Sequence, residues 1–409
     1  MSSTPERPYD LVVFGATSFV GQILCAVLHE RHGSDSDLRW AIAGRNPEKL
    51  ADVAARLDLN VDHIVADAAD ELALAALAES TRVIVSTVGP YALHGSLLVA
   101  AAVTAGTDYC DLTGEPHWMQ SMIDAHHEGA ALSGARIVHA CGFDSIPSDL
   151  GVFFTQAQAQ ELLGEPCTQI NMRVKALKGA ASGGTVASML NIVEEASNDP
   201  SLRRVLTNPY ALAPAGMRTG VRQPNVTLPM RDEASERWVA PFVMAAVNTR
   251  VVHRSHALRG RPWGDDFLYD EAMLTGSGPL GALRAGAVSG GLGGLMGAIS
   301  VGPVRKILAD KVLPKPGEGP SPEAQEAGFF DIRFYGTTAS GARITTKVTG
   351  DRDPGYGSTA KMLAEAAIML LGLDPADVPG GFWTPSTAFG EPFIQELVDH
   401  AGLTFGVID

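Results

Sequence analysis

The stretch Leu11-Val12-Val13-Phe14-Gly15-Ala16-Thr17-Ser18-Phe19-Val20-Gly21 decides how the first third of the chain folds. Its first four residues form a continuous apolar run, which is typical of a strand buried on both faces of a sheet. A glycine-bearing turn follows, and then a helical pattern. Apolar residues recur after the turn at the spacing of one helical face, at Val20, Ile23, Leu24, Val27 and Leu28. The stretch therefore predicts a strand, a tight turn and a helix in direct succession.

The same alternation continues to about residue 146. Further apolar runs predict strands at 40–43, 61–66, 82–87, 109–112 and 136–140, with helical segments between most of them. Asn46 and Pro47 suit the N-cap and the first position of the second helix. Strands that alternate with helices form βαβ units, in which the strands are parallel and helices cover both faces. We therefore predict an α/β fold with a Rossmann-type, doubly wound parallel sheet.

The composition is typical of a globular protein of two or three domains. The chain has 409 residues, of which 45% are hydrophobic and 19% are charged. Its formal net charge of -15 argues against a general nucleic-acid binder, which normally carries a basic face. The first ten residues lack the apolar segment of a secretion signal, so we expect a cytoplasmic protein. No His, Cys and acidic residues have the spacing of a metal site, so we predict no metal.

The glycine-bearing turn has the features of a dinucleotide-binding loop. A pyrophosphate approaches backbone N–H groups at the start of a helix, where the helix dipole favours an anion. Gly15 can supply the tight turn, and Gly21 lets the helix pack closely on the strand. The commoner pattern has glycine at the middle position, where this chain has Ser18, a small residue that can bond a phosphate. The predicted cofactor-binding loop comprises Gly15, Ala16, Thr17, Ser18, Phe19, Val20 and Gly21.

The ends of the following strands predict which nicotinamide cofactor binds. Sites that prefer NAD usually place an acidic residue at the end of the second strand to bond the ribose 2′-hydroxyl. Here that strand ends in Gly44 and Arg45, and a guanidinium matches the 2′-phosphate of NADP. We therefore predict NADPH, with NADH less favoured; the alternative for Arg45 is a solvated residue at a helix start. The other predicted cofactor residues, Asp67, Val88, Gly89 and Pro90, follow the third and fourth strands.

The pattern changes after about residue 147. Helical patterns cover 150–163 and 185–196, and five prolines predict an irregular segment at 200–229. Residues 329–338 and 342–349 alternate in type around Ser340-Gly341, which predicts a β-hairpin. Helices are predicted at 356–371 and 391–401, and a last strand at 403–408. The proline-rich residues 314–322 predict an exposed connection.

Several motifs together resemble the saccharopine dehydrogenase-like oxidoreductases. The motifs are Gly15-Ala16-Thr17, Gly44-Arg45, Val88-Gly89-Pro90-Tyr91, Asp108-Tyr109-Cys110-Asp111-Leu112-Thr113-Gly114-Glu115, Cys141-Gly142-Phe143-Asp144-Ser145-Ile146-Pro147-Ser148-Asp149, Ser182-Gly183-Gly184-Thr185 and Tyr356-Gly357-Ser358-Thr359-Ala360. Within this family the chain is most similar to the trans-acting enoyl reductases of complex, phthiocerol-type lipid synthesis in bacteria. Those enzymes act on polyketide chains held by a modular synthase.

The resemblance implies both an architecture and a function. It implies a dinucleotide-binding domain at 1–146, an inserted mixed α/β domain at 147–350, and a C-terminal segment at 351–409 that returns to the first domain. It also implies NADPH-dependent reduction of a carbon–carbon double bond in a long apolar acyl or polyketide intermediate, carried by an acyl-carrier domain of a polyketide synthase. Two alternatives stay open: a C–N oxidoreductase like saccharopine dehydrogenase itself, and a lipid-associated interaction protein with a vestigial nucleotide fold.

Enoyl reduction narrows the choice of catalytic residues. The reaction needs a hydride at the β-carbon, a polarised carbonyl and a proton at the α-carbon. Tyr91 is a candidate donor near the nicotinamide, and Asp111, Glu115 or Asp144 could organise it. Each has a structural alternative: Tyr91 packs, Asp111 and Glu115 cap the next helix, and Asp144 caps the helix that begins near residue 146. Our predicted catalytic residues are Tyr91, Asp111 and Asp144.

Two further segments have an unusual charge pattern. Four positive charges lie within twelve residues, at Arg250, Arg254, Arg259 and Arg261. They form either a contact surface for an acidic acyl-carrier domain or an ordinary solvated face. Residues 285–304 are uncharged and hold seven glycines. They are a membrane span, a surface that contacts lipid or gathers substrate, or a buried helix or flexible loop. The second alternative predicts peripheral contact with a membrane or lipid.

Overall fold

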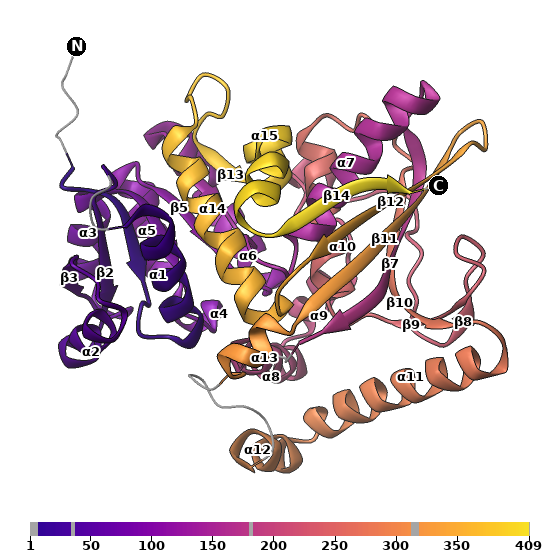
Figure 1. Cartoon of the computed structure of the whole chain (residues 1–409), viewed down its shortest axis with the longest axis horizontal. Coiled ribbons are helices and arrows are strands. Elements are labelled where there is room, and N and C mark those ends of the chain that lie inside the picture. The colour runs from indigo at the N-terminus through magenta and orange to yellow at the C-terminus, as the bar shows by residue number, and fades with distance from the viewer. Residues whose placement is uncertain (1–6, 34–36, 180–182, 312–318, 409) are drawn as a thin grey trace.

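The computed structural model describes residues 7–33, 37–179, 183–311 and 319–408. Two seven-stranded sheets organise these residues, and they lie on opposite sides of Figure 1. The first sheet comprises β1 Tyr9–Phe14, β2 Trp40–Gly44, β3 Asp62–Val65, β4 Thr81–Ser86, β5 Asp108–Asp111, β6 Arg136–Val138 and β13 Gly381–Trp383. Its order is β13-β6-β5-β4-β1-β2-β3, and neighbouring strands are parallel. The predicted doubly wound parallel sheet is therefore confirmed.

Alternate side chains of β1 build the two faces of this sheet. Leu11 and Val13 belong to one core cluster, whereas Val12 and Phe14 belong to another. All four side chains are at most 2% exposed, because helices cover both faces. The helices that connect or cover these strands are α1 Phe19–His32, α2 Pro47–Leu57, α3 Glu71–Ser80, α4 Tyr91–His94, α5 Ser96–Ala105, α6 Pro116–Ser133 and α14 Thr359–Gly372.

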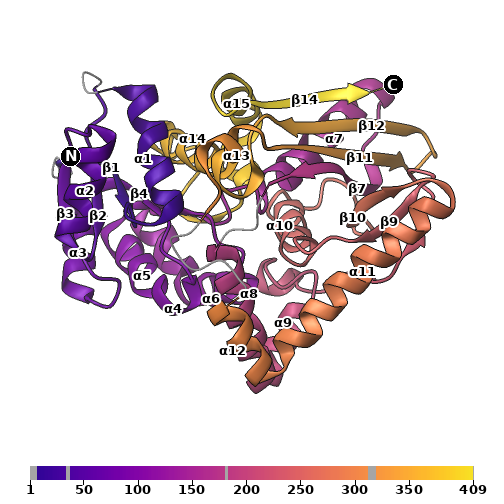
Figure 2. The ribbon, with the colours of Figure 1, turned by 60° about the horizontal axis from the view of Figure 1, so that its bottom comes forward.

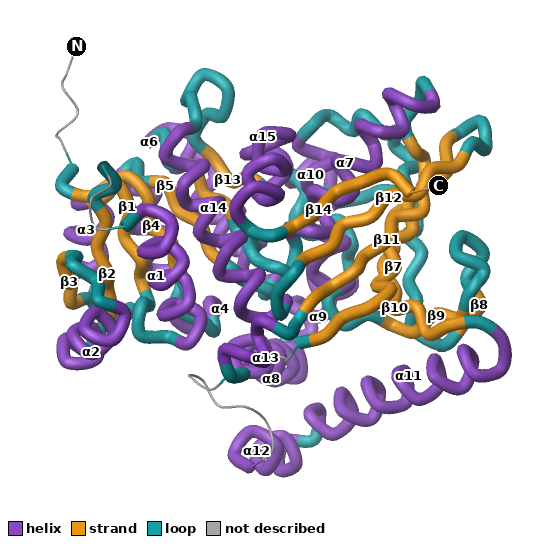
Figure 3. The backbone as a smooth tube through the Cα atoms, in the orientation of Figure 1, coloured by secondary structure: helices purple, strands orange, loops and turns teal. Residues whose placement is uncertain are grey.

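The second sheet is mixed and lies in the part of the chain that follows the first six strands (Figure 3). Its strands are β7 Cys167–Lys178, β8 Met230–Arg231, β9 Trp238–Pro241, β10 Leu268–Gly276, β11 Phe329–Thr338, β12 Arg343–Gly350 and β14 Leu403–Ile408. The order is β14-β12-β11-β7-β10-β9-β8. β7 pairs with β10 in parallel, and the other pairs are antiparallel. β11 and β12 form the predicted hairpin.

Helices surround this second sheet and carry the chain to and from it. They are α7 Ile146–Leu163, α8 Gly183–Asn198, α9 Pro200–Thr207, the 3-10 turn η1 Ala215–Met217, α10 Ala245–Leu258, α11 Gly278–Ser300, α12 Gly302–Lys311 and α13 Pro322–Glu326. α11 runs along the outer edge of the molecule, with α10 on its inner side (Figure 2). Its N-terminal part packs on β9 and β10, and it also contacts α8 and α12.

The C-terminal segment joins the two sheets. The π-helical segment η2 Pro354–Ser358 leads into α14, which packs against α1, and α15 Pro385–His400 follows β13. β13 extends the first sheet beside β6. The last strand differs from the expectation that residues 351–409 return to the first domain, because β14 pairs with β12 in the second sheet. The domain limits at residues 146 and 350 stay a prediction.

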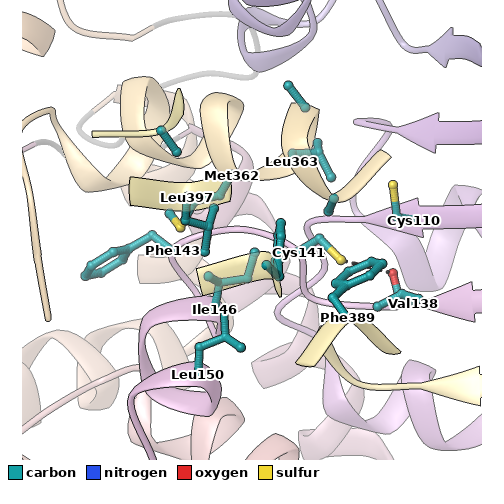
Figure 4. Close-up of a cluster of buried hydrophobic side chains, with 14 of the residues drawn as sticks. Cys110, Val138, Cys141, Phe143, Ile146, Leu150, Met362, Leu363, Phe389 and Leu397 are labelled. Atoms are coloured by element: carbon teal, nitrogen blue, oxygen red, sulfur yellow. Dashed lines mark hydrogen bonds between the residues drawn. The ribbon is translucent and has the colours of Figure 1, made fainter. Parts of the chain in front are cut away.

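An apolar core continues from the first sheet into the inserted region. In Figure 4, Cys141 and Ile146, on either side of the loop after β6, lie among side chains of α14 and α15 such as Leu363 and Phe389. Burying one such large apolar side chain contributes roughly 1.5–3 kcal/mol. The loop that contains Asp144 is therefore anchored at both ends. The cysteines are free and buried: Cys25, Cys110, Cys141 and Cys167.

The structure differs from the sequence prediction mainly between residues 147 and 350. The prolines of 200–229 predict an irregular segment, but Pro200 begins α9, because proline is tolerated at the first position of a helix. β7 and β10 are absent from the prediction. Their polar residues hide the strand pattern, since Arg173 and Asp270 pair with one another in the folded protein. The predicted connection at 314–322 lies largely outside the described residues.

Candidate functional site

The turn after β1, which we call the glycine cradle, is packed too closely for a side chain at either of its glycines. Gly15 has a φ of 94°, and a Cβ there would lie 2.6 Å from Cγ2 of Val88. A Cβ at Gly21 would lie 2.2 Å from the carbonyl oxygen of Gly15. Neither contact is possible, so both positions require glycine, and the turn packs closely on itself and on the residues after β4. The tight turn predicted at Gly15 and the close packing of the helix predicted at Gly21 are both present.

Ser18 holds this turn together through its hydroxyl. Its Oγ accepts the N–H of Gly21 at 2.9 Å and shares a hydrogen bond with Oγ1 of Thr87 at 2.9 Å. Thr87 in turn donates to the carbonyl of Gly15 at 3.0 Å. Ser18 is therefore the N-cap of α1 and ties the turn to the end of β4. A phosphate contact of this serine stays a prediction.

The first backbone donors of α1 are free for an anion. Phe19 and Val20 are the first two residues of the helix, and within the described ranges no hydrogen bond occupies their N–H groups. Such groups at a helix start bind phosphate readily. The ring of Phe19 packs edge-to-face on the ring of Tyr356, with 4.7 Å between the ring centroids. This contact links the turn to η2. Ala16 is buried beneath the turn.

The other predicted cofactor residues follow the ends of the neighbouring strands. Gly44 ends β2 beside Thr17, whose Oγ1 would lie 3.8 Å from a Cβ at Gly44. Arg45 is exposed, and no hydrogen bond or ion pair in the described part of the chain holds its guanidinium. Asp67 is exposed after β3, where Oδ1 accepts the N–H of Ala69 at 2.9 Å and closes a turn. Val88, Gly89 and Pro90 follow β4.

Tyr91 has its hydroxyl committed to the backbone. It is 3% exposed, its Oη donates to the carbonyl of Ser86 at 2.9 Å, and the N–H of Leu112 donates to it at 3.4 Å. Burial, with further contributions from nearby carboxylates, raises the pKa of this phenol well above its ordinary value. The packing alternative therefore describes Tyr91 better than the role of a proton donor.

Asp111 and Glu115 are also structural in this arrangement. Asp111 is fully buried; Oδ2 lies 2.7 Å from Nδ1 of His139, and Oδ1 accepts the N–H groups of Thr113 and Ala140 at 3.1 Å each. Glu115 accepts the N–H groups of Tyr91 and Ala92, at the start of α4, at 2.8 and 2.9 Å. It caps α4 rather than α6, the next helix after β5, because the fold brings the end of β5 beside the start of α4.

Asp144 stands apart from the other predicted catalytic residues. It lies in the loop after β6 and is partly buried, and in the described part of the chain its carboxyl has no hydrogen-bond partner. A Cβ at Gly114 would lie 3.7 Å from Oδ2 of Asp144 and 3.9 Å from Cε of Met244. Burial raises the pKa of Asp144 to about 7. Ser145 is the N-cap residue of α7, and Asp144 makes no capping bond.

A buried polar network lies next to Asp144, and the sequence gives no signal for it. Oδ1 of Asn248 accepts the hydroxyl of Ser145 at 3.1 Å, which orients the amide. The amide nitrogen donates to Glu271 at 3.0 Å and to Ser148 at 3.1 Å. Glu271 also accepts the hydroxyl of Tyr269 at 2.7 Å. The network connects the loop after β6 to β10, and its partners are far apart in the chain.

Two arginines of the four-arginine segment are buried, whereas Arg259 is exposed and Arg261 is half-buried. Arg250 and Arg254 are at most 5% exposed. Arg250 donates to the carbonyls of Ala246 and Leu206, and Arg254 donates to those of Leu212 and Phe382. The two side chains therefore satisfy backbone carbonyls inside the protein. The other two arginines are also engaged, with Arg259 over the ring of Phe153 and Arg261 paired with Asp265.

The uncharged segment 285–304 forms most of α11 and the start of α12. Ala285 and Ile299 are buried, whereas the residues between them are half-buried or exposed. The described helices include none that is long and apolar enough to cross a membrane. The described residues also hold no group of three His, Cys, Asp or Glu side chains that could bind a metal.

Comparisons with known proteins identify the family. The model of the saccharopine dehydrogenase NADP-binding domain matches residues 11–138. A trans-acting enoyl reductase of Mycobacterium bovis is 39% identical over 99% of each chain, and a Mycobacterium tuberculosis protein that bears this name provisionally is 41% identical over 97% of each. Saccharopine dehydrogenase from Saccharomyces cerevisiae shares the fold, with a TM-score of 0.53 at 12% identity over 98% of this chain and 100% of its own. The chain therefore belongs to the saccharopine dehydrogenase-like oxidoreductases, in the group of the trans-acting enoyl reductases.

Proposed function

We propose that this protein is an NADPH-dependent enoyl reductase that acts on a long apolar acyl or polyketide chain carried by a polyketide synthase. The observation that carries the proposal is the combination of the glycine cradle, with its free helix-start N–H groups, and a carboxyl that has no hydrogen-bond partner among the described residues. The cradle lies at the end of β1, and Asp144 lies at the end of β6 in the same sheet. Ligands of such sheets bind outside the carboxyl ends of the strands. The names of the full-length relatives agree with this chemistry.

The residues around the cradle fit a phosphorylated dinucleotide. Gly15 and Gly21 let the turn pack tightly, and the N–H groups of Phe19 and Val20, which are free within the described residues, would hold the pyrophosphate. The exposed guanidinium of Arg45 would pair with a 2′-phosphate, which NADPH has and NADH lacks. NADPH bound there supplies a hydride.

Asp144 would supply the proton that completes the reduction. As the β-carbon gains a hydride, the π electrons of the double bond move toward the α-carbon. The O–H bond of Asp144 then breaks, and its proton forms the new bond at the α-carbon. The carboxylate regains a proton from water. A pKa of about 7 suits this role, because it leaves part of the carboxyl protonated at neutral pH.

Two arginines of α10 are not available to the amino-acid-derived substrate of a C–N oxidoreductase. Such a substrate carries carboxylates, which are best bound by free guanidinium groups. Arg250 and Arg254 are occupied by backbone carbonyls, so they are not available for this purpose.

The decisive experiment measures NADPH consumption with a long α,β-unsaturated acyl thioester as substrate. We expect a saturated product, with deuterium from labelled NADPH at the β-carbon and a solvent proton at the α-carbon. Mass spectrometry of the product checks both positions. The Asp144→Asn variant is the matched control, and it should bind NADPH normally but reduce slowly. If the protein binds NADPH but reduces imines and no enoyl thioester, the C–N alternative replaces this proposal.

A further inference from the structure

A large cavity lies beneath α11, in the inserted region of the fold. Its volume is about 950 Å3, which is at the upper end of the range for small-molecule sites. Its surface is mostly apolar. Four segments line it: residues 206–210 with 218–227, the start of α10 with the residues before it, residues 269–271 of β10, and the inner face of α11. On α11 the lining residues are Ser289, Leu292, Gly293 and Met296.

Met244 and the network of Asn248 link the cavity to the surroundings of Asp144. Val243 and Ala245 line the cavity. Met244 lies between them in the chain. Its Cε and Oδ2 of Asp144 would both lie within 4 Å of a Cβ at Gly114. Glu271 lines the cavity too, and through Asn248 it connects to Ser145, the neighbour of Asp144.

The charged residues that line the cavity are Arg218, Arg222, Arg250, Asp270 and Glu271. Asp270 pairs with Arg173 and Arg218 with Asp124, Arg250 donates to a backbone carbonyl, and Glu271 is compatible with an apolar ligand. Burial raises the pKa of Glu271 to about 7, so it carries only part of a charge at neutral pH. Its two oxygens already accept hydrogen bonds from Tyr269 and Asn248. A hydrocarbon chain that passes Glu271 would therefore leave no polar partner unsatisfied.

The helix α11 can change its shape to fit a ligand in the cavity. A Cβ would meet no described atom within 4 Å at any of Gly286, Gly290, Gly291, Gly293, Gly294 and Gly297. Each glycine also weakens the helix by about 1 kcal/mol relative to alanine. α11 is therefore a thin and easily deformed wall, with its N-terminal end fixed where Gly281 packs against the carbonyl of Gly276.

We propose that the cavity beneath α11 holds the apolar tail of the acyl substrate, with the reacting double bond placed at Asp144. This inference rests on the proposed function and adds the location of the chain. The uncharged and glycine-rich composition of α11 then has a physical reason. Charged side chains on α11 would oppose a hydrocarbon there, and bulky ones would fill the space that the tail needs.

Two leucine substitutions on α11 test this location. Gly293→Leu places a side chain in the cavity, whereas Gly291→Leu projects from about the opposite side of the helix, because two residues turn it by about 200°. Both variants remove one glycine from an open position, so their effects on helix stability match. The measurement is binding of straight-chain fatty acids of increasing length, by displacement of a fluorescent fatty acid.

We expect wild-type affinity to rise with chain length. Gly293→Leu should weaken the longest acids roughly tenfold, the effect of excluding about two CH2 groups, and Gly291→Leu should not. Equal effects of the two variants, or no binding of fatty acids by the wild type, would overturn the inference. NADPH titration and reduction of a short enoyl thioester separate the two proposals. If chains bind as expected but no thioester is reduced, only the proposed function fails; if thioesters are reduced while Gly293→Leu binds long chains normally, only the cavity assignment fails.

Discussion

Replacing Asp144 with asparagine should stabilise the protein at alkaline pH while it slows reduction. Burial raises the pKa of Asp144 from 3.8 to about 7, so the folded state favours the protonated form. Each unit corresponds to about 1.4 kcal/mol, which gives an upper limit of about 4 kcal/mol. The carboxyl is only partly buried, so solvent reduces this value, and we expect about 2 kcal/mol.

The sign of the effect follows from the raised pKa. Below about pH 4 both the folded and the unfolded chain bind the proton, and Asp144 has no cost. Between about pH 4 and pH 7 the unfolded chain loses its proton while the folded chain keeps it, so stability falls. Above about pH 7 the penalty is constant. Asparagine is neutral throughout, so the advantage of Asp144→Asn should grow between about pH 4 and pH 7 and stay constant above that.

Thermal unfolding of both proteins across this pH range measures the effect. Asp232→Asn serves as a control of opposite sign. Burial favours the protonated form of Asp232, but Arg173 at 2.6 Å outweighs burial and lowers its pKa. Removing that charge leaves Arg173 buried without one partner, so Asp232→Asn should destabilise the protein more at about pH 8 than at low pH.

Activity gives the second half of this prediction. If Asp144 donates the proton, the wild-type rate falls above about pH 7, and Asp144→Asn reduces the maximal rate by roughly 10²–10⁴-fold. An Asn variant with unchanged stability at every pH would refute the assigned desolvation. One with a normal rate would refute the catalytic role.

Three other substitutions or treatments test the rest of the site. Arg45→Ala should weaken NADPH binding about tenfold or more in a fluorescence titration, since a charged hydrogen bond is worth about 1.5–3 kcal/mol; an equal loss for NADH would contradict its role at the 2′-phosphate. Gly21→Ala should lower the unfolding temperature and NADPH affinity, because the contact with the Gly15 carbonyl outweighs the gain of about 1 kcal/mol in helix propensity; a more stable variant with normal binding would show that the turn is not tightly packed. A thiol reagent should label no cysteine until the protein unfolds, because all four are buried; rapid labelling of the native protein would disprove this.

Local patterns in the sequence determined much of the nucleotide-binding region. The apolar run of β1 and the turn after it specify their own structure, because burial on both faces and a positive φ at Gly15 are local requirements. The same holds for the hairpin of β11 and β12 around Ser340-Gly341. In each case the residues that decide the structure are neighbours in the chain.

The tertiary structure alone decided which polar residues are available for chemistry. Tyr91, Asp111 and Asp144 look alike as candidates in the sequence. Only the fold gives Tyr91 the N–H of Leu112 and Asp111 the ring of His139, while it leaves Asp144 without a partner among the described residues. Likewise, the charge of Arg250 predicts exposure until the fold supplies carbonyls that make its burial tolerable. Hydrogen-bond partners that are distant in the chain set the protonation and reach of a side chain, and no local pattern encodes them.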